Sequence, residues 1–578
     1  MREQFMRWTR GVLAGVVVAL ASVAAGACGG DGGTEPTGLQ PDILIVGADS
    51  GNAGTQVEIA GSNFEQGASV DFGTWAVDSL VFVDATTILA FAPDSLARDS
   101  VYDVQVTNPG GKFDVLADAF KAVAPALQVV NGVSKPSGNA GSTVILEGKS
   151  FGDLLGRGTV YFSDAAGQPV AAAIALPENW TNEFIVTTVP TDAETGPVWI
   201  ETLTGSTDSI EFTLLQSATF SPSLINWTST QALPDSSQGH GSVFLAIEGG
   251  AGAGNLIYVT GGADGSLSLS TDVAYAEIDA GGQLGAYTGA TALTAPRAFH
   301  GAALATPFNA LIDTAVAGHL YVVGGVDGTG APTSTVYTAA VSKDRSVGAW
   351  STTTSLPVPL HSMGVVVFRS WLYLAGGATT ADDPVADVYR ARINEDGTLG
   401  SWESQPALPY PRAHAPLVQF AGVLYMFGGD SAAVAPGDNT VTGTTVGQIY
   451  YHPLDLRTGV LKNASWTLNP NEMIKAVSKH SVVAAGGTVL VSGGLYSGAS
   501  NSSTEHQYAS INPDGTIESF NGATGSQTIA GAGGAGGVPF FNHAAITYVD
   551  ASGVAHVVIV GGNDVTDATS PVPDTYYY

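Results

Sequence analysis

The sequence predicts an all-β protein built from repeated units. Glycine accounts for 74 of its 578 residues, and tight glycine turns suit short strands better than long helices. β-Branched and aromatic residues alternate with polar ones along most of the chain, whereas a helical spacing of apolar residues is scarce after residue 30. Two patterns recur, one twice and the other six times. The length suffices for three or four domains.

The balance of charge excludes one class of partner. Acidic residues outnumber basic ones by 51 to 20, and the net charge is −31. Nucleic-acid binding needs clustered lysine and arginine to contact the phosphates. We therefore expect no nucleic-acid partner.

Residues 1–27 have the pattern of a secretory signal peptide. Arg2, Arg7 and Arg10 precede an apolar run of about 17 residues, 11–27, which ends in small residues. A retained membrane anchor is the alternative, because the run reaches the lower limit for a spanning helix.

Cys28 is the only cysteine, so the chain has no intrachain disulfide. The segment AGAC (25–28) resembles the lipobox of bacterial lipoproteins, although Ala25 stands where that family prefers leucine. The resemblance implies that Cys28 is acylated and becomes the mature N-terminus, and Gly29 implies export to the outer membrane or cell surface; a chance cysteine is the alternative. Residues 28–40 would then be the lipidated cysteine and a flexible, glycine-rich tether of about 20 Å. The lipid is the only membrane contact we expect.

Residues 41–122 and 125–215 share one pattern, G-x-x-V-x-(I/L)-x-G-x-x-F, at 54–64 and 141–151. The alternation gives each strand one buried face, and the second glycine is predicted to permit the turn before the phenylalanine. Each unit has room for about seven short strands, which predicts an immunoglobulin-like sandwich.

These units resemble the IPT/TIG family. The strand and turn YDVQVTNPGGK (102–112) match the family's late strand, and the resemblance covers all of 41–122. It is softer in 125–215, where the late strand has no NPGG. Members of the family mostly act as spacers or interaction modules, so the resemblance implies no chemistry.

From residue 220 to 578 a second pattern occurs six times. Each copy has a histidine, an apolar strand ending in a diglycine, and a strand with tyrosine. The diglycines are Gly261 and Gly262, Gly324 and Gly325, Gly376 and Gly377, Gly428 and Gly429, Gly493 and Gly494, and Gly561 and Gly562. The histidines are His240, His300, His361, His414, His480 and His543. Successive diglycines are about 52 to 68 residues apart, a spacing that is typical of propeller blades.

An aromatic strand follows the tyrosine in five copies, with tryptophan at Trp350, Trp402 and Trp466. The sixth copy stops at DTYYY without one, whereas INWTSTQALP (225–234), with Trp227, stands alone before the first histidine. Joining the two gives six four-stranded units, the last taking its outer strand from the N-terminal side. We therefore predict a six-bladed β-propeller at 220–578.

This domain resembles the kelch family in its diglycines, its tyrosine and tryptophan, and the Pro-Arg approach to a blade. It departs from that family where Tyr287 and Phe520 replace tryptophan and where 521–542 is a Gly/Ala-rich insertion. The resemblance implies a fold class of two immunoglobulin-like sandwiches followed by a six-bladed kelch-type β-propeller.

We predict no cofactor or metal. Six histidines at equivalent positions would lie too far from the axis to share one ion, since Zn–N bonds are about 2.0–2.1 Å long. The Tyr–Cys copper site of some kelch oxidases is excluded, because Cys28 is the sole cysteine. The Asp-rich loops 428–439 and 561–574 could hold calcium, but neither has a fixed ligand spacing, and solvated loops are the simpler interpretation.

Two arginines are candidate ligand-binding residues. Arg297 and Arg412 occur in the related contexts PRAFH and PRAH, and arginine is a good clamp for carboxylates; a structural role in the repeat is the alternative. We expect a monomeric, non-enzymatic binding, adhesion or scaffold protein that recognises a protein or glycan through one propeller face. The alternative is a carbohydrate-active enzyme resembling the kelch sialic acid epimerases, which requires charged side chains converging in one deep pocket.

Overall fold

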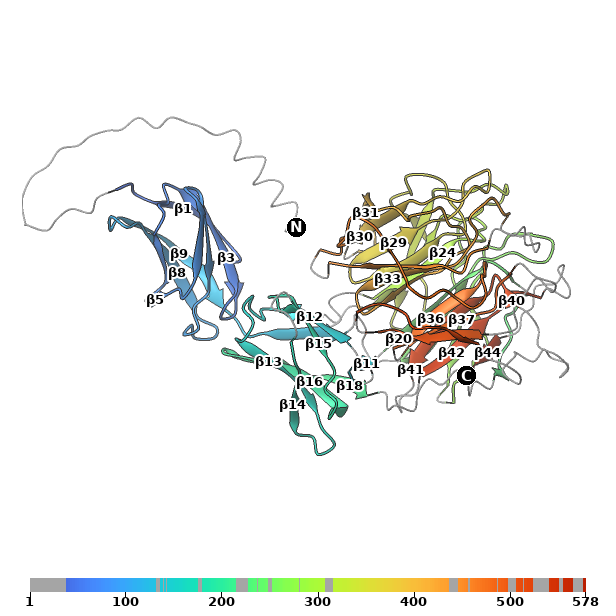
Figure 1. Ribbon diagram of the computed structural model, residues 1–578, viewed down its shortest axis with the longest axis horizontal. Coiled ribbons are helices and arrows are strands. Elements are labelled where there is room, and N and C mark those ends of the chain that lie inside the picture. The colour runs from blue at the N-terminus through green and yellow to red at the C-terminus, as the bar shows by residue number, and fades with distance from the viewer. Residues whose placement is uncertain are drawn as a thin grey trace, which may run out of the picture.

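The computed structural model is an all-β protein, which confirms the predicted class. It describes residues 38–130, 136–138, 140–141, 143–174, 179–214, 227–235, 237–247, 252–279, 281–306, 315–394, 396–435, 445–455, 458–485, 487–496, 506–512, 514–522, 540–549, 555–564 and 575–577. No α-helix occurs within these ranges, and none of their segments is a helix able to span a membrane. The predicted signal peptide and Cys28 lie outside the described residues. Figure 1 shows two sandwiches followed by a larger domain of many sheets.

The first sandwich packs two antiparallel-rich sheets around an apolar core. One sheet has the order β1 (Asp42–Gly47), β3 (Gln56–Ser62), β7 (Thr87–Phe91) and β6 (Leu80–Asp84). The other has the order β2 (Ser50–Gly51), β9 (Phe113–Ala122), β8 (Val101–Thr107), β4 (Ser69–Phe72) and β5 (Trp75–Ala76). Alternate residues of the strands point inward, as the pattern predicted, and Val57, Ile59 and Phe72 are fully buried.

The second sandwich repeats this plan. Strands β10 (Ala126–Val130), β12 (Thr143–Lys149) and β15 (Phe184–Thr188) form one sheet. The other has the order β11 (Ser137–Gly138), β18 (Ile210–Leu214), β16 (Glu194–Thr202), β13 (Gly158–Ser163) and β14 (Pro169–Ala171), with β17 (Gly205–Ser206) beside β16. Its core contains Phe151, Phe162, Trp180 and Phe212.

The glycine before each core phenylalanine has a different role from the one predicted. Gly61 lies inside β3 without a positive φ, and the left-handed turn is made by Asn63, at φ 60°. A Cβ on Gly61 would clash with the backbone carbonyl oxygen of Asp42 and would lie 2.6 Å from the ring of Phe64. A Cβ on Gly148 would clash in the same way with the carbonyl oxygen of Ala126 and would lie 2.5 Å from the ring of Phe151. Glycine is therefore required by the close approach of the neighbouring strand and the phenylalanine ring rather than by the turn.

The larger domain contains six four-stranded antiparallel sheets, which we number 1 to 6. Sheet 1 has the order β20 (Gly241–Ile247), β21 (Gly254–Thr260), β22 (Val273–Ile278) and β23 (Thr288–Gly289). Sheet 2 has the order β24 (Gly301–Ala305), β25 (Val316–Val323), β26 (Val336–Ser342) and β27 (Ser351–Thr352). Sheet 3 has the order β28 (Gly364–Phe368), β29 (Trp371–Ala375), β30 (Val388–Ile393) and β31 (Leu399–Gln405). Sheet 4 has the order β32 (Leu417–Phe420), β33 (Val423–Phe427), β34 (Ile449–Pro453) and β35 (Thr467–Leu468). Sheet 5 has the order β36 (Ser481–Ala485), β37 (Thr488–Ser492), β38 (His506–Ser510) and β39 (Asn521–Gly522).

Sheet 6 is assembled from two distant parts of the chain. It contains β41 (Ala544–Val549), β42 (Ala555–Val560), β44 (Thr575–Tyr577) and, outermost, β19 (Thr228–Ser229). Thr228 pairs with Tyr577, which confirms the predicted origin of the outer strand. Two further short strands, β40 (Phe540–Phe541) and β43 (Asn563–Asp564), pair with each other; β40 precedes β41 in the chain, and β43 follows β42.

The repeated residues hold neighbouring sheets together. All twelve glycines of the diglycines have a positive φ, which explains why glycine recurs there. Indole N–H groups reach back to the segment that leaves the preceding sheet: Trp350 Nε1 donates to the carbonyl of Thr291 at 2.8 Å, and Trp402 Nε1 to that of Thr354 at 3.1 Å. Trp466 is buried in the same role. Trp227 Nε1 lies 2.7 Å from His506 Nε2 of sheet 5.

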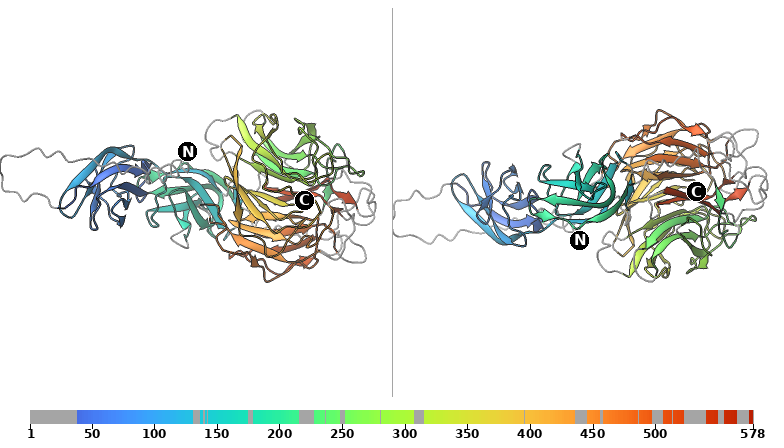
Figure 2. Two further views of the ribbon diagram at one scale, coloured as in Figure 1. Left: turned by 90° about the horizontal axis from the view of Figure 1, so that it is seen from above. Right: turned by 90° about the horizontal axis from the view of Figure 1, so that it is seen from below.

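The second sandwich is docked against the six-sheet domain, at the hairpin between β28 and β29 (Figure 2). Arg369 Nε donates to Glu147 Oε2 at 2.8 Å, and the two side chains are 11% and 1% exposed. The guanidinium lies 5.2 Å from the ring centroid of Phe184, and Ile145 shares a core with Trp371. This interface is therefore a buried ion pair set in apolar side chains.

Candidate functional site

Six residues at the centre of the larger domain share an unusual backbone conformation. One lies in the turn before the first strand of each sheet, with φ between 52° and 59°. These six, called here the central residues, are Gly239, Phe299, Ser362, His414, Lys479 and Asn542. The residue before each one pairs with the residue after the diglycine of the same sheet, which establishes that the six positions are equivalent.

The central residues are joined by a cycle of backbone hydrogen bonds. The N–H of each donates to the carbonyl of the central residue in the preceding sheet: Phe299 to Gly239 at 2.7 Å, Ser362 to Phe299 at 2.8 Å, His414 to Ser362 at 2.9 Å, Lys479 to His414 at 3.0 Å, and Asn542 to Lys479 at 2.9 Å. The N–H of Gly239 donates to the carbonyl of Asn542 at 3.1 Å and completes the cycle. All six N–H groups and all six carbonyl groups of the central residues are thereby paired.

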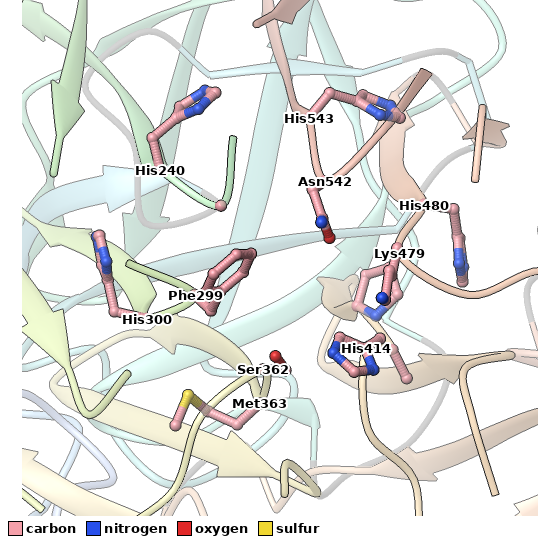
Figure 3. Close-up of a pocket in the computed structure, with 13 residues that line it drawn as sticks. His240, Phe299, His300, Ser362, Met363, His414, Lys479, His480, Asn542 and His543 are labelled. Carbon is pink, nitrogen blue, oxygen red and sulfur yellow. The ribbon is translucent and has the colours of Figure 1, made fainter. Parts of the chain in front are cut away.

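A pocket of about 170 Å³ lies at this cycle, and all six sheets contribute to it (Figure 3). All six central residues line it, together with Met363, Ala415, Pro416 and four of the histidines. Its described lining contains no aspartate or glutamate, although the chain carries 51 of them. The sequence alone did not reveal Phe299, Ser362, Lys479 and Asn542 as site residues. The only signal was that unlike residues occupy one position of a repeat.

The six histidines are not equivalent, which corrects the prediction. His240, His300, His480 and His543 directly follow the central residue of their sheet, whereas His414 is itself a central residue and His361 precedes one. The error arose because the number of residues between each histidine and its diglycine differs from sheet to sheet. The equivalent positions of the six sheets can therefore be aligned only by the residue with left-handed φ. Within the described residues, no group of three or more histidine, cysteine, aspartate or glutamate side chains is placed to hold a metal.

The four histidines that directly follow a central residue are buried between neighbouring sheets. His300 Nε2 lies 3.0 Å from Thr260 Oγ1 of sheet 1, and His543 Nε2 lies 3.0 Å from Ser492 Oγ of sheet 5. Burial lowers the pKa of His300, His480 and His543 to about 3, and that of His240 to about 4. These imidazoles are therefore neutral at pH 7.

His414 is held by an acidic partner. Its Nδ1 lies 3.0 Å from Asp430 Oδ2, and the two side chains are 3% and 2% exposed. Burial nonetheless lowers the pKa of His414 to about 4. Because a carboxylate has no proton to donate, Nδ1 carries the proton and Nε2 has a lone pair. Nε2 is buried without a hydrogen-bond partner among the described residues. Asp430 belongs to the Asp-rich loop 428–439, and its buried carboxylate contacts His414.

Arg297 and Arg412 do not line the pocket. Both are 2% exposed. The Arg297 guanidinium lies 5.3 Å from the ring centroid of Tyr337, and Arg412 Nη2 donates to Gln448 Oε1 at 3.1 Å. Each arginine thus packs on the sheet that follows it, and the structure does not bring the two together as a clamp.

Comparison with known proteins defines the class of one domain. The two-sheet architecture of the first sandwich is immunoglobulin-like. The IPT/TIG family model matches residues 45–119, so the chain contains an IPT/TIG domain there. No curated protein matches the sequence. A solved structure, titled "Structure of YjhT", is 12% identical, covers 60% of this chain and 95% of that chain, and has a TM-score of 0.40.

Proposed function

We propose that this protein is a bacterial envelope lipoprotein whose six-sheet domain is a closed, kelch-type propeller that binds a small polar ligand in its central pocket. In this proposal Cys28 carries the lipid, residues 29–40 form a tether, and the two sandwiches place the propeller away from the membrane. Membrane contact is through the lipid only, and the protein acts as a monomer.

Contacts between sheets support the closed propeller. The first strands of the six sheets contact one another in order from β20 to β41, and β41 contacts β20. The hydrogen-bond cycle joins Asn542 to Gly239, and a Cβ on Gly561 of sheet 6 would lie 2.7 Å from the ring of His240. Sharing sheet 6 between β19 and β44 leaves the domain without an open seam.

The side chains of the central residues carry the binding proposal. Left-handed φ favours glycine or asparagine, and other residues cost on the order of 1–3 kcal/mol each. Four of the six central residues are nevertheless Phe299, Ser362, His414 and Lys479. The fold thus repeats its backbone six times but departs from the residues that this backbone prefers, which is typical of a functional site.

The absence of carboxylates from the described lining disfavours one kind of carbohydrate-active enzyme, a glycoside hydrolase, and leaves the sialic acid epimerase-like enzyme as the alternative. Glycoside hydrolysis ordinarily needs two acidic side chains on either side of the scissile bond. No aspartate or glutamate is among the described residues that line the pocket, and Asp430 lies behind His414. A screen of sugar substrates for turnover tests the alternative directly.

Replacing Asn542 by glycine should weaken ligand binding without unfolding the domain. The backbone accepts glycine at φ 54°, while the amide that faces the pocket is lost. A ligand is first found by thermal shift against sugars, sugar acids and short peptides, and its affinity is then measured by calorimetry. We expect a loss of about tenfold or more. Leu267→Gly is the matched control, since Leu267 has φ 59° and is exposed outside the pocket. Equal affinity losses in both variants would refute the site.

Cys28→Ala should remove the lipid. Cells that express the full chain are grown with radiolabelled palmitate, and the protein is recovered from the membrane fraction. We expect label on the native chain and none on the variant, because acylation requires the thiol of this sole cysteine. Label that survives the substitution, or none on either chain, would contradict lipidation.

A further inference from the structure

Sheets 3 and 4, which are neighbours around the pocket, have no histidine directly after their central residue. Sheet 3 has Met363, and sheet 4 has Ala415, where four other sheets have histidine. Each has instead a displaced histidine, His361 or His414, with an aspartate as partner. The two imidazole centroids lie 6.3 Å apart. The repeat is thus broken twice, on one side of the pocket, and each break creates a His–Asp pair.

In sheet 3 the displaced histidine connects an aspartate with a serine. His361 Nδ1 lies 3.0 Å from Ser362 Oγ, and its Nε2 lies 3.1 Å from Asp382 Oδ1. Because the carboxylate accepts the proton of Nε2, the lone pair of Nδ1 faces the serine hydroxyl. The imidazole is 1% exposed, so its orientation is fixed by these two contacts. The order of groups is that of a serine hydrolase, with the ring turned so that Nδ1 rather than Nε2 faces the serine.

The surroundings of Ser362 suit a nucleophile. It is a half-buried central residue on the pocket wall, held at φ 54°. The next central residues in the cycle are His414, whose buried Nε2 has no partner among the described residues, and Lys479. Lys479 is buried, and its positive charge contributes to the lowered pKa of both His361 and His414. Lys479 lines the pocket beside these residues, and its ammonium donates a hydrogen bond to the carbonyl of Ala435 at 2.9 Å.

We propose that the central pocket hydrolyses small esters, with Ser362 as the nucleophile, His361 as the general base and Asp382 as the residue that orients it. The oxygen of Ser362 bonds to the acyl carbon while its proton passes to His361 Nδ1. That proton then goes to the alcohol oxygen as the bond between this oxygen and the acyl carbon breaks. Water attacks the acyl-serine in the same way, its proton returns through His361 to the oxygen of Ser362, and the carboxylic acid leaves. The ammonium of Lys479 stabilises the tetrahedral oxyanions.

This inference uses the pocket of the proposed function but not its unknown ligand, so it is tested with small reagents. The full chain is treated with a fluorophosphonate probe, the modified peptide is identified by mass spectrometry, and release of p-nitrophenol from p-nitrophenyl acetate is followed. We expect probe on Ser362, none there in Ser362→Ala, and labelling and ester hydrolysis slowed about 100-fold or more in His361→Gln.

Matched controls separate chemistry from folding. Ser351→Ala removes an exposed serine outside the pocket, and His506→Gln removes a buried histidine that does not line it; both should label at the native rate. Thermal melting checks that each variant is folded. Labelling at another serine, or a native rate in folded His361→Gln, would overturn the assignment. Binding without labelling would overturn only this inference, and labelling without a natural ligand would leave it intact.

Discussion

Replacing Arg369 by alanine is expected to lower the free energy of unfolding by about 3–5 kcal/mol, one of the two largest effects that we predict. The substitution leaves Glu147, 1% exposed, without its ion-pair partner inside an apolar interface. Burial already raises the pKa of Glu147, and only the charge and hydrogen bond of Arg369 oppose this effect. Urea unfolding followed by tryptophan fluorescence measures the change.

The matched control removes both charges. Glu147→Leu combined with Arg369→Met keeps the volume of the interface and should recover most of the lost stability, since a buried ion pair is often replaceable by apolar residues. If the single variant unfolds at the same urea concentration as the native protein, the second sandwich does not depend on this pair for docking.

Acid is expected to unfold the six-sheet domain well above the pH at which carboxylates titrate. Burial holds the pKa of His300, His480 and His543 at about 3 and that of His240, His414 and His506 at about 4, against 6.5 in the unfolded chain. Between pH 6.5 and 4 the unfolded chain therefore binds more protons than the folded one. Stability is complete above pH 6.5 and is lost as the pH falls, by up to about 1.4 kcal/mol per pH unit for each histidine.

Unfolding free energies at pH 7, 6 and 5 test this expectation. The carboxylates whose pKa is lowered, such as Asp327 and Asp396, lose their contribution only below about pH 4, so a loss of stability between pH 7 and 5 comes from the histidines. His480→Gln removes one titrating group and should make the slope shallower by about one proton. A free energy of unfolding that stays constant from pH 7 to 5 would contradict the prediction.

The repeats were predictable because the backbone dictates their residues. Each diglycine needs two positive φ values, and Trp350 or Trp402 must contact the preceding sheet, so these residues recur and can be counted. The same counting predicted that β19 would join sheet 6. The role of Gly61 was misassigned, because close packing and a turn both select glycine, and only coordinates separate them.

The central pocket could not be predicted by the same means. Phe299, Ser362 and Lys479 share a backbone conformation but no chemistry, so a search for recurring side chains passes over them. His361 and His414 resemble the other histidines in sequence, and their displacement is apparent only from strand pairing. The pair of Glu147 with Arg369 joins domains that are far apart in the chain, and neither residue lies in a motif.

The pairing of β19 with β44 has a consequence for how the protein is made. Thr228 is synthesised before any of the six sheets, whereas Tyr577 follows nearly all of them, so sheet 6 cannot form until almost the whole domain has emerged. The strands of each sandwich pair only within their own segment of the chain, so the two sandwiches can fold first. The first five sheets of the larger domain are complete before sheet 6 can form beside them. Such non-local closure slows folding and prolongs the exposure of strand edges.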